Sequence, residues 1–231
     1  IGFWAFAAIM LINLFVSRNF TFGKPDGDGS NNSGMRALLT NRHWILFLLT
    51  AFLGGLGSMS AAAYLFPYMA ELGANETMMG IAITISTLTE LPVFFFGHHL
   101  VKRFTPRGLL LVALLMLGIR SFFYSLVNTP SLVFLVQAFG GMLFPAMWLA
   151  GVSYADENAP AGLKSTAQGL LGAMTFGFGS AIGGLLGGPM LENFGGRGMF
   201  LVFGLIILVG LVLIEGIRRM LPKEKILQPV P

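Results

Sequence analysis

The chain has 231 residues, of which 55% are hydrophobic and 10% are charged, and its mean hydropathy is +0.78. Soluble domains carry about 25% charged residues, so this composition excludes a water-soluble globular domain, and the apolar content excludes a disordered chain. Cysteine is absent, which excludes thiol chemistry and a disulfide scaffold. The composition predicts a polytopic membrane protein.

The first 42 residues divide into an apolar part and a polar part. Residues 1–16 are apolar and have neither an initiator Met nor the basic region of a signal peptide. We interpret them as the end of a transmembrane helix and the chain as the C-terminal part of a longer protein. Residues 17–42 are polar and glycine-rich in their centre, which is typical of a flexible linker.

Six further apolar runs are each long enough to cross the hydrocarbon as a helix, which needs about 20 residues. Strands of a membrane barrel would alternate in segments of about ten residues, whereas these runs are continuously apolar. We therefore expect an all-α bundle of six transmembrane helices over 43–217, preceded by the partial helix and followed by a basic tail, 218–231. The runs lie at 43–70, 77–97, 108–127, 131–154, 166–191 and 199–217.

The basic residues collect on one side of this bundle. The loops on the opposite side hold only Arg197, and Arg120 lies inside a run. By the positive-inside rule the basic side and the C-terminus are cytoplasmic, and the net charge of +4 reflects topology rather than nucleic-acid binding. Twelve of the 14 Lys and Arg residues lie on the basic side: Arg18, Lys24, Arg36, Arg42, Lys102, Arg103, Arg107, Lys164, Arg218, Arg219, Lys223 and Lys225.

Two ionisable residues, Glu90 and Arg120, lie deep inside the runs. Glu90 precedes Lys102 by 12 residues and Arg120 follows Arg107 by 13, so both lie roughly 18–20 Å above the basic loop at 1.5 Å per residue. A charge at this depth costs about 2.5–3.5 kcal/mol, so it needs a partner or a function. We expect both to face one transport cavity, and the alternative is an ion pair that only locks two helices together.

Three uncharged polar residues are candidates to line the same cavity. Thr87 lies one turn before Glu90, Gln137 is the one amide in its run, and Tyr64 lies in the outer half of the first run. The alternatives are hydroxyls bonded to their own helix backbone, and aromatic rings that serve packing or the membrane interface.

Other patterns favour structural roles. Glycines recur at small-xxx-small spacing in 166–191, which favours close helix packing. Adjacent His98 and His99 point about 100° apart on a helix, and no carboxylate or cysteine completes a metal site with them. No histidine lies inside a run to activate a serine, since His43 only begins the first run, and no phosphate-binding glycine loop occurs, so we expect no enzyme, metal or cofactor.

The segment 97–107 resembles the cytoplasmic loop signature of the major facilitator superfamily, G-x4-D-R-x-G-[RK]-[RK]. Lys102 stands in place of the acid and Thr105 in place of the second glycine. The likeness extends over about 43–217, with segments similar to the nucleoside–proton symporters and to lactose-permease-like members at 86–95, 117–122, 164–170 and 192–198. The loop match depends on Gly97, Arg103 and Arg107.

The resemblance implies the C-terminal six-helix half of a twelve-helix transporter. Glu90 matches the acid in the eighth helix of the nucleoside symporters, and Arg120 matches the ninth-helix arginine of both groups. The segment 139–145 lacks the His and Glu of the lactose permease tenth helix, and Met59 and Ala62 stand near the helix-seven amides of the nucleoside symporters. Neither sugar nor nucleoside specificity therefore follows.

The implied function is secondary active transport of a small polar solute by alternating access, with protons as the coupled ion and Glu90 as their carrier. The implied partners are the solute, protons, the bilayer and an N-terminal six-helix half; no nucleic acid is implied. The rival reading is a non-transporting receptor or scaffold on the same fold, in which Glu90 and Arg120 form a structural lock. An intramembrane enzyme is a third, weaker reading.

Overall fold

The computed structural model describes residues 10, 16, 31–160 and 162–222. The partial helix expected at 1–16, apart from Met10 and Val16, lies outside the described residues, as do residues 17–30 of the expected linker and 223–231 of the tail. Within the described ranges the chain is helical and has no strand, which confirms the all-α membrane fold.

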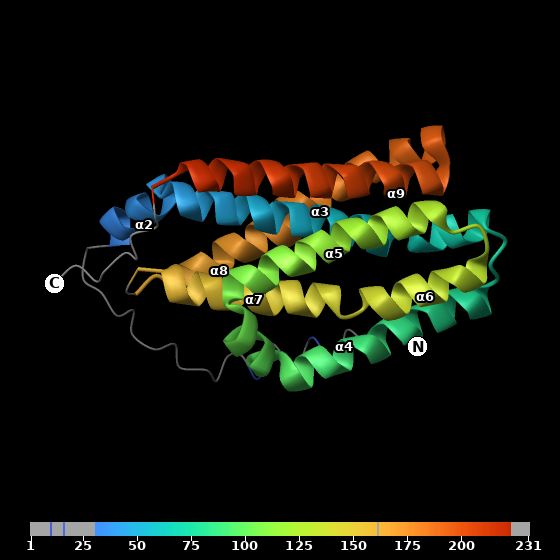
Figure 1. Cartoon of the computed structure of the whole chain (residues 1–231), viewed down its shortest axis with the longest axis horizontal. Coiled ribbons are helices and arrows are strands. Elements are labelled where there is room, and N and C mark those ends of the chain that lie inside the picture. The colour runs from blue at the N-terminus through green and yellow to red at the C-terminus, as the bar shows by residue number, and fades with distance from the viewer. Residues whose placement is uncertain (1–9, 11–15, 17–30, 161, 223–231) are drawn as a thin grey trace.

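The helices run side by side along the long axis of the molecule (Figure 1). Five helical segments of the described chain are long and apolar enough to cross a membrane, and the last of them, 164–220, bends at Gly195 into two passes. The bundle therefore makes six passes. The elements are α2 (Asn31–Thr40), α3 (Arg42–Glu71), α4 (Glu76–Phe104), α5 (Pro106–Leu126), α6 (Pro130–Gly140), α7 (Leu143–Asn158), α8 (Lys164–Gly172), η1 (Ala173–Gly179) and α9 (Ser180–Met220).

Polar side chains at the helix starts explain where the passes begin. The side chain of Asn41 accepts hydrogen bonds from the backbone N–H groups of His43 and Trp44, and that of Asn75 accepts from Met78 N–H at 2.9 Å. These bonds satisfy N–H groups that a helix start leaves without partners. Helix α2 occupies the second part of the segment expected as a linker, and its Leu38 is fully buried in the core.

The run expected as one helix at 131–154 is interrupted in the structure. Helix α6 ends at Gly140, two residues in a turn follow, and α7 begins at Leu143. Pro145 has no N–H group, so the carbonyl of Gly141 loses its helical donor four residues on. Gly141 also lies directly against the Ser86 carbonyl of α4, where a side chain would not fit. A glycine pair followed by proline therefore interrupts the regular helical hydrogen bonding of this pass, although Gly141 and Met142 keep helical backbone angles and 130–158 still forms one membrane-length span.

The next pass contains a π-helix, η1, between α8 and α9. Its Thr175 hydroxyl bonds to the Ala51 carbonyl of α3 at 3.5 Å, and the Ser180 hydroxyl donates to the Thr175 carbonyl at 3.1 Å. The last pass begins at the bend at Gly195, whose φ of 66° favours glycine.

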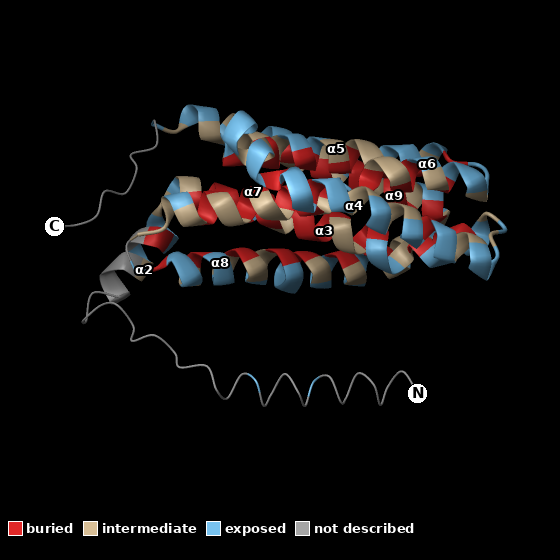
Figure 2. Ribbon diagram, turned by 90° about the horizontal axis from the view of Figure 1, so that it is seen from below, coloured by how far each residue is buried: buried red, intermediate tan, exposed pale blue. Residues whose placement is uncertain are grey.

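Helix α3 packs against α9 and η1 and is mostly buried, whereas α4 is mostly exposed (Figure 2) and lies along the lower edge of the bundle in Figure 1. The glycine-rich seam explains the close packing: Gly179 and Gly183 face the backbone of α3, where added Cβ atoms would lie 2.6 Å from the Phe52 carbonyl oxygen and 2.8 Å from that of Leu56. Among the described residues the core has two apolar clusters, one around Trp44 at one end of α3 and the other around Tyr68 at its other end.

Candidate functional site

A cavity of about 390 Å³ lies among α3, α4, α5, α6, α7, η1 and the start of α9. Its wall combines hydroxyl, amide and charged groups with apolar side chains, so it can contact both the polar and the apolar parts of a solute. The cavity brings together four residues that the sequence predicts for a site: Thr87, Glu90, Arg120 and Gln137.

Glu90 and Thr87 reach the cavity from α4. Two neighbouring threonines do not: Thr84 bonds to the Gly80 carbonyl at 2.9 Å and Thr89 to the Ser86 carbonyl at 2.8 Å. The two alternatives for hydroxyls near Glu90, bonding to their own helix backbone or lining the cavity, therefore apply to different residues. The hydroxyls of Thr84 and Thr89 bond to carbonyls of α4, while Thr87 and Glu90 line the cavity.

Arg120 is held by a hydrogen-bond network between α5 and α6. Its Nη2 donates to Gln137 Oε1 at 2.6 Å and to the Tyr124 hydroxyl at 3.1 Å, and that hydroxyl donates to Gln137 Oε1 at 2.8 Å. Gln137 is 2% exposed and Tyr124 is fully buried. Such a network fixes the guanidinium in one orientation at the cavity wall.

Gly140 makes room for this arrangement. A Cβ atom added there would overlap Nε of Arg120 and would lie 2.6 Å from its Cδ. Arg120 Nε is itself buried and has no hydrogen-bond partner among the described residues. The guanidinium of Arg120 therefore packs against Gly140. Its Nε is buried, and its Nη2 is bound to Gln137 and Tyr124.

Glu90 and Arg120 share the cavity without forming an ion pair with each other in the part of the chain that the structure describes. The described residues give Glu90 no hydrogen-bond donor, whereas Arg120 is bound to Gln137 and Tyr124. In this conformation the two charged groups do not lock α4 to α5 directly.

Tyr64 lies outside the set of residues that line the cavity. Its hydroxyl donates to the Gly184 carbonyl of α9, and its ring lies beside Gly187. It therefore connects α3 to α9 in this conformation.

The three residues of the loop signature lie near the end of the bundle where α4 meets α5. Arg107 forms an ion pair with Glu215 of α9, which also lies 3.4 Å from Arg219. The Arg103 guanidinium lies 5.8 Å from the centre of the Phe104 ring, and Gly97 faces the side chain of Leu149. This cluster lies in the basic region, away from the cavity.

Sequence reasoning missed Tyr124 and Ser58. Tyr124 lies four residues after Arg120, which places both on one face of a helix, so the spacing could have identified it. Ser58 lines the cavity, and its hydroxyl is buried without a partner among the described residues. Nothing in the surrounding apolar sequence distinguishes Ser58 from a structural serine.

Comparisons with known proteins agree with this architecture. The chain is 24% identical over 226 residues to major facilitator superfamily domain-containing protein 6-like protein A of Xenopus laevis, covering 96% of this chain and 37% of that protein. It is 27% identical over 180 residues to a maltose permease of Geobacillus stearothermophilus, covering 78% of this chain and 46% of that protein.

A third relative is the putative nucleoside transporter YegT of Escherichia coli, 28% identical over 165 residues, with 68% of this chain and 37% of that protein covered. The chain thus spans less than half the length of these curated relatives. A family model described as the MFS_1 like family matches residues 1–202. The match covers most of the chain, and the resemblance to the major facilitator superfamily predicted from the sequence is confirmed: the chain belongs to the MFS_1 like family.

Proposed function

We propose that this chain is the C-terminal half of a secondary transporter that moves a small polar solute by alternating access. The main support for the proposal is a cavity that both Glu90 and Arg120 line, with no ion pair between them among the described residues. The lengths of the relatives support a half-protein, because the chain covers only 37–46% of the three compared above. The other wall of the site then comes from the N-terminal half, as in transporters built from two repeats.

In this mechanism Arg120 orients the solute and Glu90 carries the coupled proton. Burying a lone charge in an apolar environment is expensive, and a carboxylate avoids that cost by binding a proton. Proton binding from one side and release to the other would couple solute movement to the proton gradient. In this proposal the C-terminus faces the cytoplasm, which the positive charge of the loops on its side of the bundle supports.

The names of two relatives suggest the first solutes to test. One is called a maltose permease and another a putative nucleoside transporter. Labelled maltose and labelled uridine are therefore the first probes for uptake by cells that express the full-length gene product, followed by a panel of other sugars and nucleosides.

The decisive variant is Glu90→Gln in the full-length gene product. The neutral amide resembles the protonated acid and cannot cycle, so solute exchange should persist while accumulation against a gradient is lost. Glu76→Gln makes the same chemical change on the exposed start of α4 and should leave accumulation unchanged. Continued accumulation by Glu90→Gln would remove Glu90 from the coupling role.

The receptor or scaffold reading predicts a different order of effects. If Glu90 and Arg120 served as a structural lock, each single neutral variant would lower thermal stability by leaving a buried charge, and Glu90→Gln with Arg120→Gln would restore it. The absence of a direct ion pair between the two among the described residues supports transport over this reading. Thermal unfolding of the two singles and the double separates the two cases.

A further inference from the structure

A second cavity lies on the outer surface of the bundle, in the seam between α5 and α9. It has a volume of about 460 Å³ and shares no residue with the central cavity. Its walls are largely apolar and exposed: Val112 is 50% exposed, Leu115 is 40% and Val212 is 70%. Because these helices cross a membrane, an apolar groove on their outer face is open to lipid chains.

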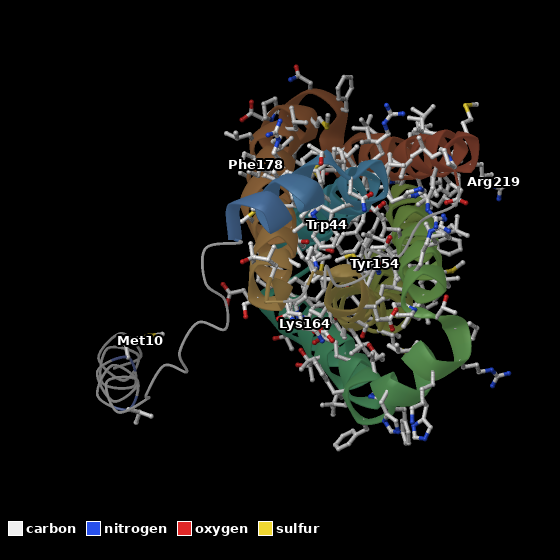
Figure 3. All side chains as sticks on the ribbon, turned by 90° about the vertical axis from the view of Figure 1, so that its left-hand side faces the viewer. Met10, Trp44, Tyr154, Lys164, Phe178 and Arg219 are labelled. Carbon is white, nitrogen blue, oxygen red and sulfur yellow. The ribbon has the colours of Figure 1, made fainter. Side chains whose placement is uncertain are left out.

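One end of this groove carries charge. Glu215 and Arg219 line it, and the Arg219 side chain is 80% exposed. Glu215 already faces two guanidinium groups, that of Arg107 and that of Arg219. The three side chains leave an excess positive charge at the mouth of the groove. Figure 3 views the bundle from this end, with Arg219 at its edge and Trp44 and Tyr154 inside.

The order of residues along the two helices fits a phospholipid. Arg219 follows Val212 by seven residues, so the groove extends about 10 Å from the charged end toward the membrane interior at 1.5 Å per residue. Helix α5 runs antiparallel beside α9, with Arg107 at the charged end and Leu115 deeper. A cationic mouth followed by an apolar channel matches a phosphate headgroup followed by an acyl chain.

We propose that the α5–α9 groove binds one anionic phospholipid, with its phosphate on Arg219 and an acyl chain along Val112, Leu115 and Val212. The positive excess beside Glu215 selects an anionic headgroup over a zwitterionic one. Bound lipid would connect the end of α9 to the start of α5, the same helix that places Arg120 in the central cavity. The site depends only on the membrane fold and not on the proposed transport activity.

The experiment measures lipid binding to the full-length gene product in detergent by native mass spectrometry, with phosphatidylglycerol and phosphatidylcholine of equal chain length. We expect the first phosphatidylglycerol to bind at least about fivefold more tightly, since one arginine near the membrane surface changes the affinity for anionic lipid by about that factor. Equal binding of the two lipids would mean that they bind only as the nonspecific lipid ring around the bundle, and it would overturn the proposal.

Two variants address the two parts of the site. Arg219→Gln should lower phosphatidylglycerol binding to the level of phosphatidylcholine, because it removes the exposed cation. Gly216→Phe should weaken both lipids, because Gly216 lines the groove and a Cβ there has open space, so the ring can enter the channel without disturbing the packing. Unchanged phosphatidylglycerol binding in either variant overturns the proposal.

Two controls complete the design. Lys102→Gln removes one exposed positive charge in the same basic region, on α4. It should leave phosphatidylglycerol binding unchanged, and an effect as large as that of Arg219→Gln would show a diffuse charge effect instead of a site. Glycerol phosphate has the headgroup charge without a chain and should not displace the lipid. Displacement at equal concentration would contradict the role of the groove.

Discussion

Thr105 should limit the stability of the bundle, and its replacement by glycine should raise that stability. Thr105 has φ 60° and ψ 149° and is the only non-glycine residue with positive φ in the described chain. This backbone region is almost exclusive to glycine, and occupying it costs about 1–3 kcal/mol. It is also the position at which the loop signature of the superfamily carries its second glycine.

The expected gain follows from three terms for Thr105→Gly. Relief of strain contributes about 2 kcal/mol. The hydroxyl accepts a hydrogen bond from the Gly108 N–H at 3.2 Å at the start of α5, and losing this cap to glycine costs only about 0.3 kcal/mol. The greater freedom of glycine in the unfolded chain costs about 0.7 kcal/mol. The net stabilisation is about 1 kcal/mol, or ~2–4 °C in Tm for a domain of this size.

Thermal unfolding in detergent measures this shift, and Thr105→Ala is the matched control. Alanine removes the cap and keeps a Cβ atom in the strained conformation, so its Tm should fall by a few degrees for a loss of about 1 kcal/mol. If glycine lowered Tm as far as alanine does, strain at this position would not be a significant cost and the reasoning would be wrong.

Three further outcomes are expected. Gly140→Ala should reduce solute accumulation about as strongly as Arg120→Ala, because the added methyl displaces the guanidinium without changing any charge; normal uptake would contradict this. Tyr124→Phe should destabilise the bundle by about 1 kcal/mol in thermal unfolding, through loss of its hydrogen bonds; an unchanged Tm would argue against the network. An impermeant thiol reagent should label Glu76→Cys in intact cells but not Lys102→Cys, and the reverse pattern would invert the proposed orientation.

The arrangement of the passes could be predicted from the sequence because the bilayer constrains it strongly. Every pass needs about 20 apolar residues, and each break between passes has polar residues, proline or glycine. Counting residues from the basic loop in the same way predicts that Glu90 and Arg120 lie at one depth. Both residues line the cavity of the structure.

The partners of these residues were harder to predict. The bonds of Arg120 to Gln137 and Tyr124 depend on how α5 and α6 are rotated about their axes, which apolar content does not determine. Tyr64 lies in the outer half of the first run, but the rotation of α3 directs its hydroxyl to the Gly184 carbonyl of α9 instead of the cavity. Helix rotation depends on side-chain packing between distant segments.

The two passes that depart from regular α-helix both contribute to the cavity wall. The segment after α6 contributes Gly141 and Phe144 to this wall, and η1 contributes Thr175 and Phe176. Irregular backbone is tolerated inside a membrane only where it is buried in protein or lines a cavity, so these segments have to lie there. A π-helix and a broken helix also have fewer regular backbone bonds to resist bending than α5 has. If the bundle changes shape when solute binds, we therefore expect these two walls to move against a rigid α5, which keeps Arg120 in place.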